Sequence, residues 1–386
     1  MSQRTDIIFP ASPVTWAHPE RKVEFDAWLQ TVAPPHGLDA ASLRMASADA
    51  SFRRYLRIDS QAGTRIIMDA PPDKGSCTSF VGIAKLMTDI GLKVPEILQW
   101  DEARGFMLLT DMGLQTMLQA IDADAPPPLG LYMDAVDTLV QWQLASREGV
   151  LPPYSEALLR RDMELFPQWY ITEHRQTPVD AAMRKTLDEA FACILANNQS
   201  WPSVFVHRDF MPRNLMVANV APTLGTSVSS LPPKGAIAAR GGPAPLTPDN
   251  RLGVLDFQDA VYGPITYDIA SLLRDAFISW EEDFCLDVTI RYWDKARKAG
   301  LPVGDDFGAF YRGVEWMGLQ RHLKVAGIFA RLTIRDGKPH YLADTPRFIH
   351  YIRSTCGRYR ELKPLLRLVE KVEGIAVPNV FAFGRT

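Results

Sequence analysis

The stretch VHRDFMPRNLMV, residues 206–217, constrains the fold more than any other part of this chain. It places His207, Asp209 and Asn214 between apolar residues that would otherwise be typical of buried strands. Polar and charged side chains are costly inside a buried strand, so we expect a loop between two short strands. Metal-assisted phosphoryl transfer needs a proton acceptor and oxygen ligands of this kind.

Length and charge exclude several classes of protein. The chain has 386 residues, of which 47% are hydrophobic, and this fits two lobes better than one domain. Its 42 Lys and Arg residues nearly balance its 45 Asp and Glu residues, so no broad basic surface for nucleic acid is predicted. The N-terminal stretch MSQRTDIIFPASPVTW lacks the apolar core of a signal peptide. No run of roughly 18 apolar residues predicts a membrane span.

The four cysteines are far apart in the sequence and form no CxxC pair. A zinc site or a disulfide framework is therefore not expected, and a reduced cytoplasm is the simplest location.

The first 113 residues are predicted to form a small strand-rich lobe. Phe25, Trp28, Leu29 and Val32 recur at the spacing of one helical face. Two strand pairs follow, FRRYLRI with TRIIMDA and EILQWD with GFMLLTD, each joined by turn-forming residues. A helix over residues 79–91 lies between the two pairs and ends at a glycine.

Helical patterns dominate residues 114–386, which we expect to form a larger lobe. Residues 131–148, residues 179–198 and the region after about 265 have helical periodicity. Short strands are predicted at FVH, NLMVAN and LGVLDFQ. Residues 221–250 are rich in Pro, Gly, Ser and Ala and are interpreted as a mobile insertion at the tip of a hairpin. The predicted fold is α+β, with the two-lobed layout of protein kinases.

Three side chains form the candidate reaction centre. Asp209 can accept the proton of an attacking hydroxyl, and Asn214 begins the next strand. Mg²⁺ prefers oxygen ligands, and Asp256 in GVLDFQDA supplies a second one. The alternative for Asp209 is a buried acid that caps a turn. Asp259 is interpreted either as a helper of the metal site or as a surface acid.

The pair VHRDFMPRNLMV and LDFQDAVYGPITYDIASLLRD resembles the aminoglycoside phosphotransferase and choline kinase superfamily. The resemblance implies that Asp209 is the catalytic base and that Asn214 and Asp256 bind Mg²⁺. It also implies that His207 and Asp268 brace the catalytic loop, and Asp268 is interpreted as structural.

Three further segments, MDAPPDK, FQDAVYGPITYDIASLLRDAFISW and LQRHLKVAGIFARL, are similar to the anomeric kinases of bacterial cell-wall recycling. This similarity implies ATP-dependent phosphorylation of the 1-hydroxyl of N-acetylmuramic acid and N-acetylglucosamine.

The nucleotide loop is unusual because ADASFRRYLRI has no glycine. Ser51, Phe52, Arg53 and Arg54 are the candidates for holding phosphate, although a plain hairpin with solvated arginines remains open. The next strand has Met68 or Asp69 where the phosphate-binding Lys of a kinase belongs. Our hypothesis is that Arg53, Arg54 or Lys74 replaces that charge. The adenine is expected on the backbone of the lobe connector, at Thr110, Asp111, Met112 and Gly113.

The sugar is expected to meet Arg274, Asp275, Arg321 and Lys324 in the helical lobe, where Arg or Lys could pair with the lactyl carboxylate of N-acetylmuramate. Ordinary core or surface roles remain open for each of them. The basic segment QRHLKVAGIFARL favours a neutral or anionic acceptor over an aminoglycoside.

Two alternatives stay open: a kinase of the same fold for choline, homoserine or an aminoglycoside, and a non-catalytic nucleotide-binding protein. The absent Lys favours the second, whereas the intact set of Asp209, Asn214 and Asp256 opposes it. The sequence does not indicate the oligomeric state.

Overall fold

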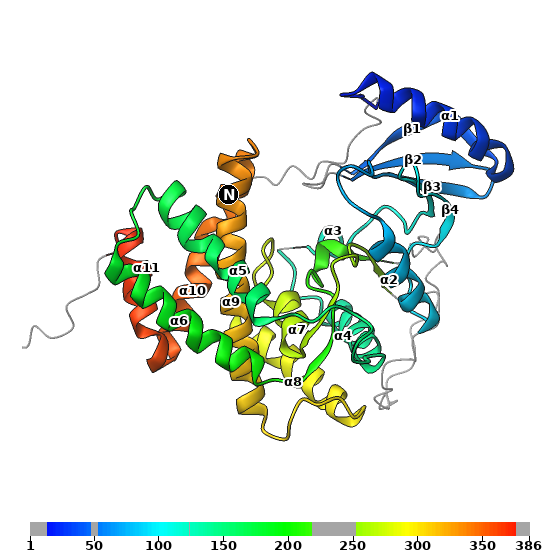
Figure 1. Cartoon of the computed structure of the whole chain (residues 1–386). Coiled ribbons are helices and arrows are strands. Elements are labelled where there is room, and N and C mark those ends of the chain that lie inside the picture. The colour runs from blue at the N-terminus through cyan, green and yellow to red at the C-terminus, as the bar shows by residue number, and fades with distance from the viewer. Residues whose placement is uncertain (1–13, 48–52, 123, 218–251, 376–386) are drawn as a thin grey trace, which may run out of the picture. The chain divides into compact units, whose positions relative to one another are not determined.

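The computed structural model, shown in Figure 1, describes residues 14–47, 53–122, 124–217 and 252–375. The chain folds as two compact units. Unit 1 comprises residues 1–126 and 213–259, and unit 2 comprises residues 127–212 and 260–386. The predicted insertion at 221–250 lies outside the described residues.

Unit 1 contains an antiparallel five-stranded sheet in the order β1-β2-β3-β5-β4. Its strands are β1 (Leu38–Ser47), β2 (Arg54–Ser60), β3 (Gly63–Asp69), β4 (Ile97–Asp101) and β5 (Phe106–Thr110). Both predicted strand pairs are confirmed, because β2 pairs with β3 and β4 pairs with β5. The β2–β3 turn is two residues long, and Gly63 after it has a φ of +95°, which suits glycine.

Strand β1 was not predicted from the sequence. It pairs with β2, but its register shifts between Asp39 and Arg44 and again between Met45 and Ser47. Such irregularities break the strict alternation of apolar and polar residues by which a strand is recognised.

Helix α1 (Pro19–His36) packs on this sheet through the face that the sequence predicted. Phe25, Trp28, Leu29 and Val32 are buried together with residues of β2, β3 and β5. The helix begins with a proline and ends at Gly37, whose φ of +57° lets its N–H reach the last carbonyls.

The rest of unit 1 consists of α2 (Thr78–Asp89), α3 (Met117–Ala120) and the strand pair β7 (Leu215–Met216) and β8 (Gly253–Val254). The predicted antiparallel pairing of β7 with β8 is confirmed. Phe80 of α2 stacks on Phe257, with ring centroids 4.9 Å apart. The Val254 N–H donates to the Lys93 carbonyl. These contacts group residues 213–259 with unit 1, whereas the expected boundary after Gly113 assigned them to the helical lobe.

Unit 2 is mainly helical, as predicted. Its helices are α4 (Leu129–Leu144), α5 (Glu156–Leu165), α6 (Ala181–Gln199), α7 (Thr266–Leu273), α8 (Glu282–Lys298), α9 (Phe307–Ile334), α10 (Thr345–Arg358) and α11 (Lys363–Glu373). A π-helix, η1 (Phe166–His174), continues α5, and short 3₁₀ helices lie at Pro339–Asp344 and Arg360–Leu362. A further 3₁₀ turn, Pro212–Asn214, begins at the last residue of this segment of unit 2 and continues into unit 1. Strand β6 (Ser203–Val206) pairs with β9 (Val261–Pro264), a strand that was not predicted.

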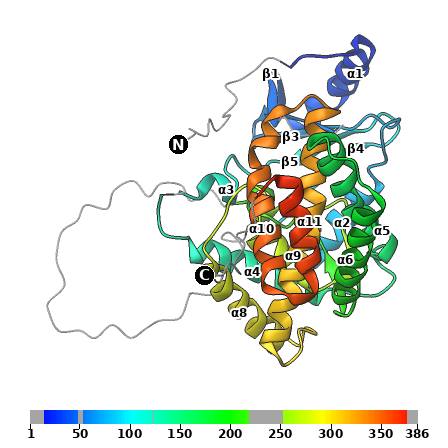
Figure 2. The same ribbon diagram turned by 90° about the vertical axis from the view of Figure 1, so that its left-hand side faces the viewer.

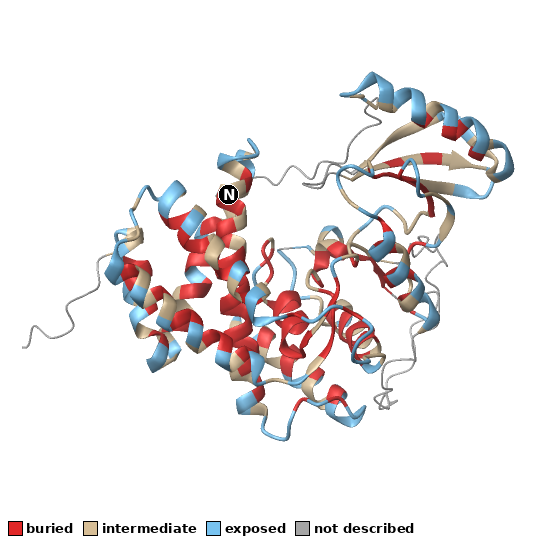
Figure 3. Ribbon diagram, viewed as in Figure 1, coloured by how far each residue is buried: buried red, intermediate tan, exposed pale blue. Residues whose placement is uncertain are grey.

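Helix α9 is the centre of unit 2. It contacts η1, α5, α6, α7 and α10, and Figure 2 shows it beside α10. Buried residues run along most of its length in Figure 3. Within the described residues, no helix has the length and hydrophobicity that a membrane crossing requires. The four cysteines, Cys77, Cys193, Cys285 and Cys356, are free thiols in the structure.

Gly327 allows α9 to approach the end of α5. A Cβ atom at this position would lie 2.3 Å from the carbonyl carbon of Leu165 and 2.4 Å from its oxygen. Both atoms belong to backbone, so they cannot rotate away as a flexible side chain would. The close packing of α5 and η1 on α9 therefore requires glycine here.

We expect Gly327→Ala to lower the free energy of unfolding by about 1–3 kcal/mol, because the added methyl group overpacks the interface. Gly357→Ala on α10 is the matched control, because a Cβ at Gly357 meets no atom within 4 Å. The control should be neutral or more stable than the parent by up to about 1 kcal/mol, since alanine favours helix over glycine. Urea unfolding measures both values, and equal effects of the two substitutions would contradict the packing argument.

Candidate active site

The loop that carries Asp209 follows strand β6 and is bound through its backbone. The His207 N–H donates to Asp268 Oδ2 at 2.7 Å, and the Arg208 N–H donates to Asp268 Oδ1 at 3.0 Å. The Asp209 N–H in turn donates to His207 Nδ1 at 3.3 Å. Three successive backbone groups of the loop therefore have defined acceptors, two of them on one carboxylate.

Arg208 has a φ of +76°, which is unusual for a residue with a side chain. Strain of this kind persists only where the surroundings fix the backbone. Asp268 accepts the Arg208 N–H, and Arg321 Nη1 donates to the Arg208 carbonyl at 2.6 Å. Both polar groups of this peptide segment are thus held directly before Asp209.

Asp268 lies in the first turn of α7 and is fully buried. Burial raises its pKa to about 7, although the two backbone N–H groups favour the ionised form. These hydrogen bonds agree with the bracing role that the family resemblance implied for Asp268. His207 is also buried and belongs to the same loop.

Asp209 is a carboxylate in a cationic environment. Burial raises the pKa of its carboxyl group, whereas the positive charges of Lys324, Arg321 and Arg208 lower that pKa. The lowering effect is the larger one, so the pKa of Asp209 lies below its ordinary value. Asp209 is therefore ionised at neutral pH and can accept a hydrogen bond from a hydroxyl group.

The sequence predicted Arg321 and Lys324 as sugar contacts, and the structure shows their partners within unit 2. The Arg321 guanidinium lies 4.8 Å from the centre of the Tyr267 ring, besides its bond to the Arg208 carbonyl. Lys324 Nζ lies 3.5 Å from the Tyr267 hydroxyl and 3.4 Å from Asp162 Oδ2. Both side chains are buried beside the catalytic loop.

Sequence reasoning missed Tyr154, Asp162 and Tyr267, which belong to the same polar network. One signal was present in the sequence. Asp162 lies on the buried face of α5 together with Leu159 and Met163, which are three residues before it and one after it. An acid on an apolar helical face needs a polar partner from elsewhere in the fold.

The predicted metal ligands lie together in unit 1. Leu255 donates its N–H to the Asn214 carbonyl, which extends the β7–β8 ladder towards Asp256. Asn214 Nδ2 is 3.4 Å from Asp256 Oδ2, and Gln258 Nε2 is 2.8 Å from Asp256 Oδ1. Asp256 has a φ of +62°, which is also unusual for a residue with a side chain.

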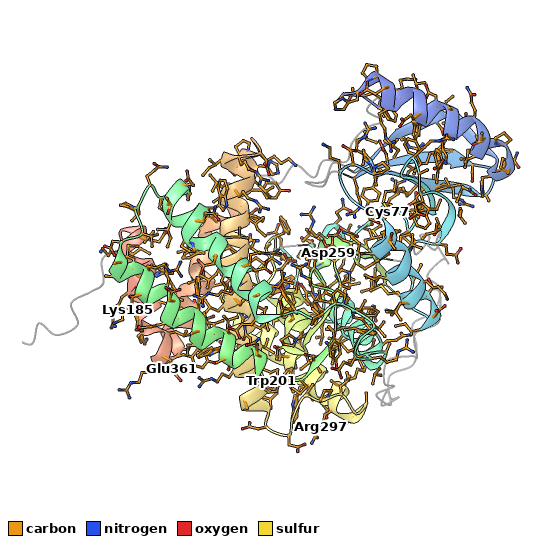
Figure 4. All side chains as sticks on the ribbon, in the orientation of Figure 1. Cys77, Lys185, Trp201, Asp259, Arg297 and Glu361 are labelled. Carbon is orange, nitrogen blue, oxygen red and sulfur yellow. The ribbon has the colours of Figure 1, made fainter. Side chains whose placement is uncertain are left out.

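This pair fits a magnesium ion. Neighbouring ligands of an octahedral Mg²⁺ with bonds of about 2.1 Å are about 3 Å apart, close to the separation of the two side chains. Turning the amide of Asn214 would present its oxygen in place of its nitrogen. Within the described residues, no three His, Cys, Asp or Glu side chains cluster as a metal site. Mg²⁺ does not need such a cluster, because it commonly retains water and phosphate oxygens. Asp259, labelled in Figure 4, is exposed, as expected for a surface acid.

In the predicted nucleotide loop, Ser51 and Phe52 lie outside the described residues. Arg54 donates to Asp69 Oδ2 from Nε at 3.0 Å, and Arg21 of α1 donates to Asp69 Oδ1 at 2.7 and 3.0 Å. Asp69 is buried, so the strand position where a Lys was expected holds an acid between two arginines. Arg53 is half-buried, and Lys74 is exposed beside Asp73.

The predicted lobe connector, residues 110–113, forms hydrogen bonds with other parts of unit 1. Arg57 Nε donates to Asp111 Oδ2 at 2.6 Å, and Arg57 Nη2 donates to the Gly113 carbonyl at 2.9 Å. The Thr110 N–H donates to the Glu96 carbonyl. Two of the backbone groups that were expected to meet adenine, the Thr110 N–H and the Gly113 carbonyl, thus have partners within unit 1.

Arg274 and Asp275 belong to a separate network in unit 2. Arg274 Nη2 donates to Glu282 Oε1 at 2.8 Å, and Arg358 Nη1 donates to the same oxygen at 2.9 Å. Asp275 Oδ1 accepts the Phe277 N–H at 2.7 Å. Arg274 and Asp275 thus have partners of their own in unit 2, and their predicted contact with the sugar stays a prediction. Arg321, by contrast, contacts the loop that carries Asp209.

The sequence matches the model of the family described as "Phosphotransferase enzyme family" over residues 42–224 and 246–305. An N-acetylmuramate/N-acetylglucosamine kinase of Neisseria meningitidis serogroup B is 43% identical over 358 residues, which is 92% of this chain and 97% of that protein. A protein of the same name from Pseudomonas putida is 42% identical, covering 86% of this chain and 89% of its own length. The resemblance inferred from the two motifs is therefore confirmed.

A solved structure of a Plasmodium vivax ethanolamine kinase superposes with a TM-score of 0.55, covering 91% of this chain and 93% of that one. The two sequences are only 10% identical, so this similarity concerns the fold alone. The predicted α+β fold of the protein-kinase type is confirmed.

We expect Asp268→Asn to destabilise the catalytic loop. An amide has one acceptor oxygen, so one of the two N–H groups, of His207 or Arg208, would face an NH₂ group instead. The cost of an unsatisfied buried donor is about 1–3 kcal/mol, measurable by urea unfolding. Phosphotransferase activity should fall with it, and a variant with parental stability and activity would contradict the bracing role.

The contribution of Glu282 to the free energy of unfolding depends on pH. Burial raises the pKa of Glu282, but hydrogen bonds from Arg358 and Arg274 lower it to about 2. Ionised Glu282 therefore stabilises the fold above pH 4.5, and this contribution is lost as the pH falls towards 2. Glu282→Gln should cost about 1–2 kcal/mol at pH 7, a value reduced for solvent screening. In urea unfolding, the deficit should shrink below pH 4.5, and a deficit that does not change with pH would contradict the ion-pair argument.

Proposed function

Because this chain belongs to the phosphotransferase enzyme family, we propose that it is an ATP-dependent kinase for the amino sugars N-acetylmuramic acid and N-acetylglucosamine. The phosphate goes to the anomeric 1-hydroxyl, and the product is the sugar 1-phosphate that peptidoglycan recycling uses. The similarity to relatives named N-acetylmuramate/N-acetylglucosamine kinase carries this proposal, because it extends over nearly the whole chain and not only over the motifs.

In the proposed reaction, Asp209 orients the acceptor hydroxyl and takes its proton. The hydroxyl oxygen forms a bond to the γ-phosphorus, while the bond from the γ-phosphorus to the bridging oxygen of ADP breaks. The lowered pKa of Asp209 supports this role, since only a carboxylate can accept the proton. Asp268 and His207 keep the loop in place.

Asn214 and Asp256 would hold Mg²⁺. When bound, the ion neutralises the negative charge of the phosphates. Gln258 donates to the Asp256 oxygen that faces away from Asn214, and so helps to orient that carboxylate.

The nucleotide and sugar contacts belong to the same proposal. Arg53, Arg54 and the connector residues Thr110–Gly113 remain our candidates for ATP. Arg321 or Lys324 could pair with the lactyl carboxylate of N-acetylmuramate, whereas N-acetylglucosamine has no such group. The substrate is thus a small molecule, we expect no nucleic acid or membrane partner, and we propose the cytoplasm as the location.

The test of the substrate is ADP release with ATP, Mg²⁺ and each of five acceptors: N-acetylmuramate, N-acetylglucosamine, choline, homoserine and kanamycin. We expect turnover with the two amino sugars and a product whose ³¹P NMR signal couples to the anomeric proton. Turnover confined to choline, homoserine or kanamycin, or a phosphate on another hydroxyl, would reject the proposal.

We expect Asp209→Asn to lower kcat by at least about 10²–10⁴-fold, because both proton acceptance and orientation of the hydroxyl are lost. Asp188→Asn on α6 is the matched control, since Asp188 pairs with Arg184 at a half-exposed position. The control should keep the parental kcat. A folded Asp209→Asn enzyme that retains most of its kcat would remove Asp209 from the role of base.

A further inference from the structure

Three polar side chains surround one carboxylate oxygen of Asp162, Oδ2, in the interior of unit 2. The Tyr154 hydroxyl donates to Asp162 Oδ2 at 2.8 Å, Lys324 Nζ lies 3.4 Å from that oxygen, and Arg208 Nη2 lies 3.6 Å from it. The Asp162 side chain is 7% exposed, and those of Lys324 and Arg208 are 10% and 16% exposed. A buried carboxylate of this kind strongly affects the cations that it contacts.

Two of these three partners also act on Asp209. Arg208 is its neighbour in the chain, and Lys324 exerts the largest of the charge effects that lower the pKa of Asp209. The same region of unit 2 contains three cations, Arg208, Arg321 and Lys324, and three carboxyl groups, Asp162, Asp209 and Asp268. The negative charge of Asp162 therefore balances part of the positive charge of Lys324 and Arg208.

We propose that Asp162 is a positioning residue, which holds Lys324 and Arg208 and so keeps the carboxylate of Asp209 available to the acceptor hydroxyl. Asp162 acts through these two cations and does not touch the substrate. The inference rests on the role of Asp209 in the proposed reaction, but it does not depend on which alcohol is phosphorylated.

The removal of the Asp162 charge has a specific consequence for Lys324. Its ammonium group sits on a flexible stem of four carbons, and a buried ammonium group without a counterion is costly. The Tyr267 hydroxyl also lies near Lys324 Nζ, at 3.5 Å, and a protonated hydroxyl carries no charge that could replace the carboxylate. Lys324 therefore turns to Asp209 and forms an ion pair with the oxygen that should receive the hydroxyl proton.

The decisive substitution is Asp162→Asn, which keeps the size of the side chain and removes its charge. We expect kcat to fall about 10–100-fold, the range found when a supporting residue of a site is lost. The KM values for ATP and for an acceptor without a carboxylate should change by less than about threefold, since Lys324 has no group to pair with on such an acceptor. Asp188→Asn is again the matched control, because it removes an acid that pairs with Arg184 at a half-exposed position of the same unit.

The double variant Asp162→Asn with Lys324→Met distinguishes positioning from a purely structural role. Without its charge, residue 324 cannot pair with Asp209, so kcat should rise at least about tenfold above that of Asp162→Asn alone. A structural defect at Asp162 would not be repaired by a second loss in the same network. A double variant no faster than Asp162→Asn overturns the proposal, as does an Asp162→Asn enzyme with parental kcat.

If Asp162→Asn does not fold, Asp162→Glu carries the test, because it keeps the charge and moves it by one methylene. Lower kcat with parental KM and melting temperature supports positioning, and parental kcat overturns it.

The acceptor in every assay is whichever compound the parent phosphorylates, or water if it phosphorylates none, so failure of the sugar assignment is a separate result. A crystal structure of Asp162→Asn gives a readout without activity. Lys324 Nζ bound to Asp209 supports the proposal, and Lys324 left beside residue 162 contradicts it.

Discussion

The hydrogen bonds from two successive backbone N–H groups to the carboxylate of Asp268 are the interaction on which the candidate site depends. They join the loop after β6 to the first turn of α7, although His207 and Asp268 are 61 residues apart in the sequence. Each of these hydrogen bonds contributes about 0.5–1.5 kcal/mol with a neutral acceptor and about 1.5–3 kcal/mol with an ionised one. Together they are comparable to the cost of about 1–3 kcal/mol of a positive φ at Arg208. The direction of the chain at Asp209 follows from that strained residue.

Helix α9 supplies the charges that surround this loop. Arg321, Lys324 and Gly327 are three residues apart and share one face of the helix. Gly327 allows the backbone of α5 to come close, and the other two place cations beside Asp162, Tyr267 and the loop. The packing of two helices thus fixes the electrostatic environment of Asp209, because each cation is buried and must lie near its counterion.

Unit 1 also contains a buried carboxylate, Asp69, that is paired with arginine side chains. Asp69 is 1% exposed and receives Arg21 from α1 and Arg54 from β2. The arginine side chains have further contacts, since Arg21 lies over the ring of Phe106 and Arg54 over that of Trp16. This lobe therefore joins its N-terminal helix to its sheet through charge as well as through the apolar core.

The sequence by itself determined the elements whose signals are local. The strand pairs β2–β3 and β4–β5 were predicted from the turn residues between them, and the helical face of α1 from its apolar spacing. The pairing of β7 with β8 was predicted by treating the segment between them as an insertion, and the motifs identified Asp209, Asn214 and Asp256 as candidates. Strand β1 was missed because its register shifts twice and its alternation is broken.

Only the tertiary structure decided which charges meet. Asp162 pairs with Lys324, and the Arg321 side chain donates to the backbone carbonyl of Arg208. Both contacts span more than a hundred residues of sequence, so no spacing in the chain predicts either one. Glu282 likewise accepts from Arg358, which lies 76 residues further along the chain. The physical reason is that helix formation depends on residues three or four positions apart, whereas the partner of a buried charge depends on how whole helices pack.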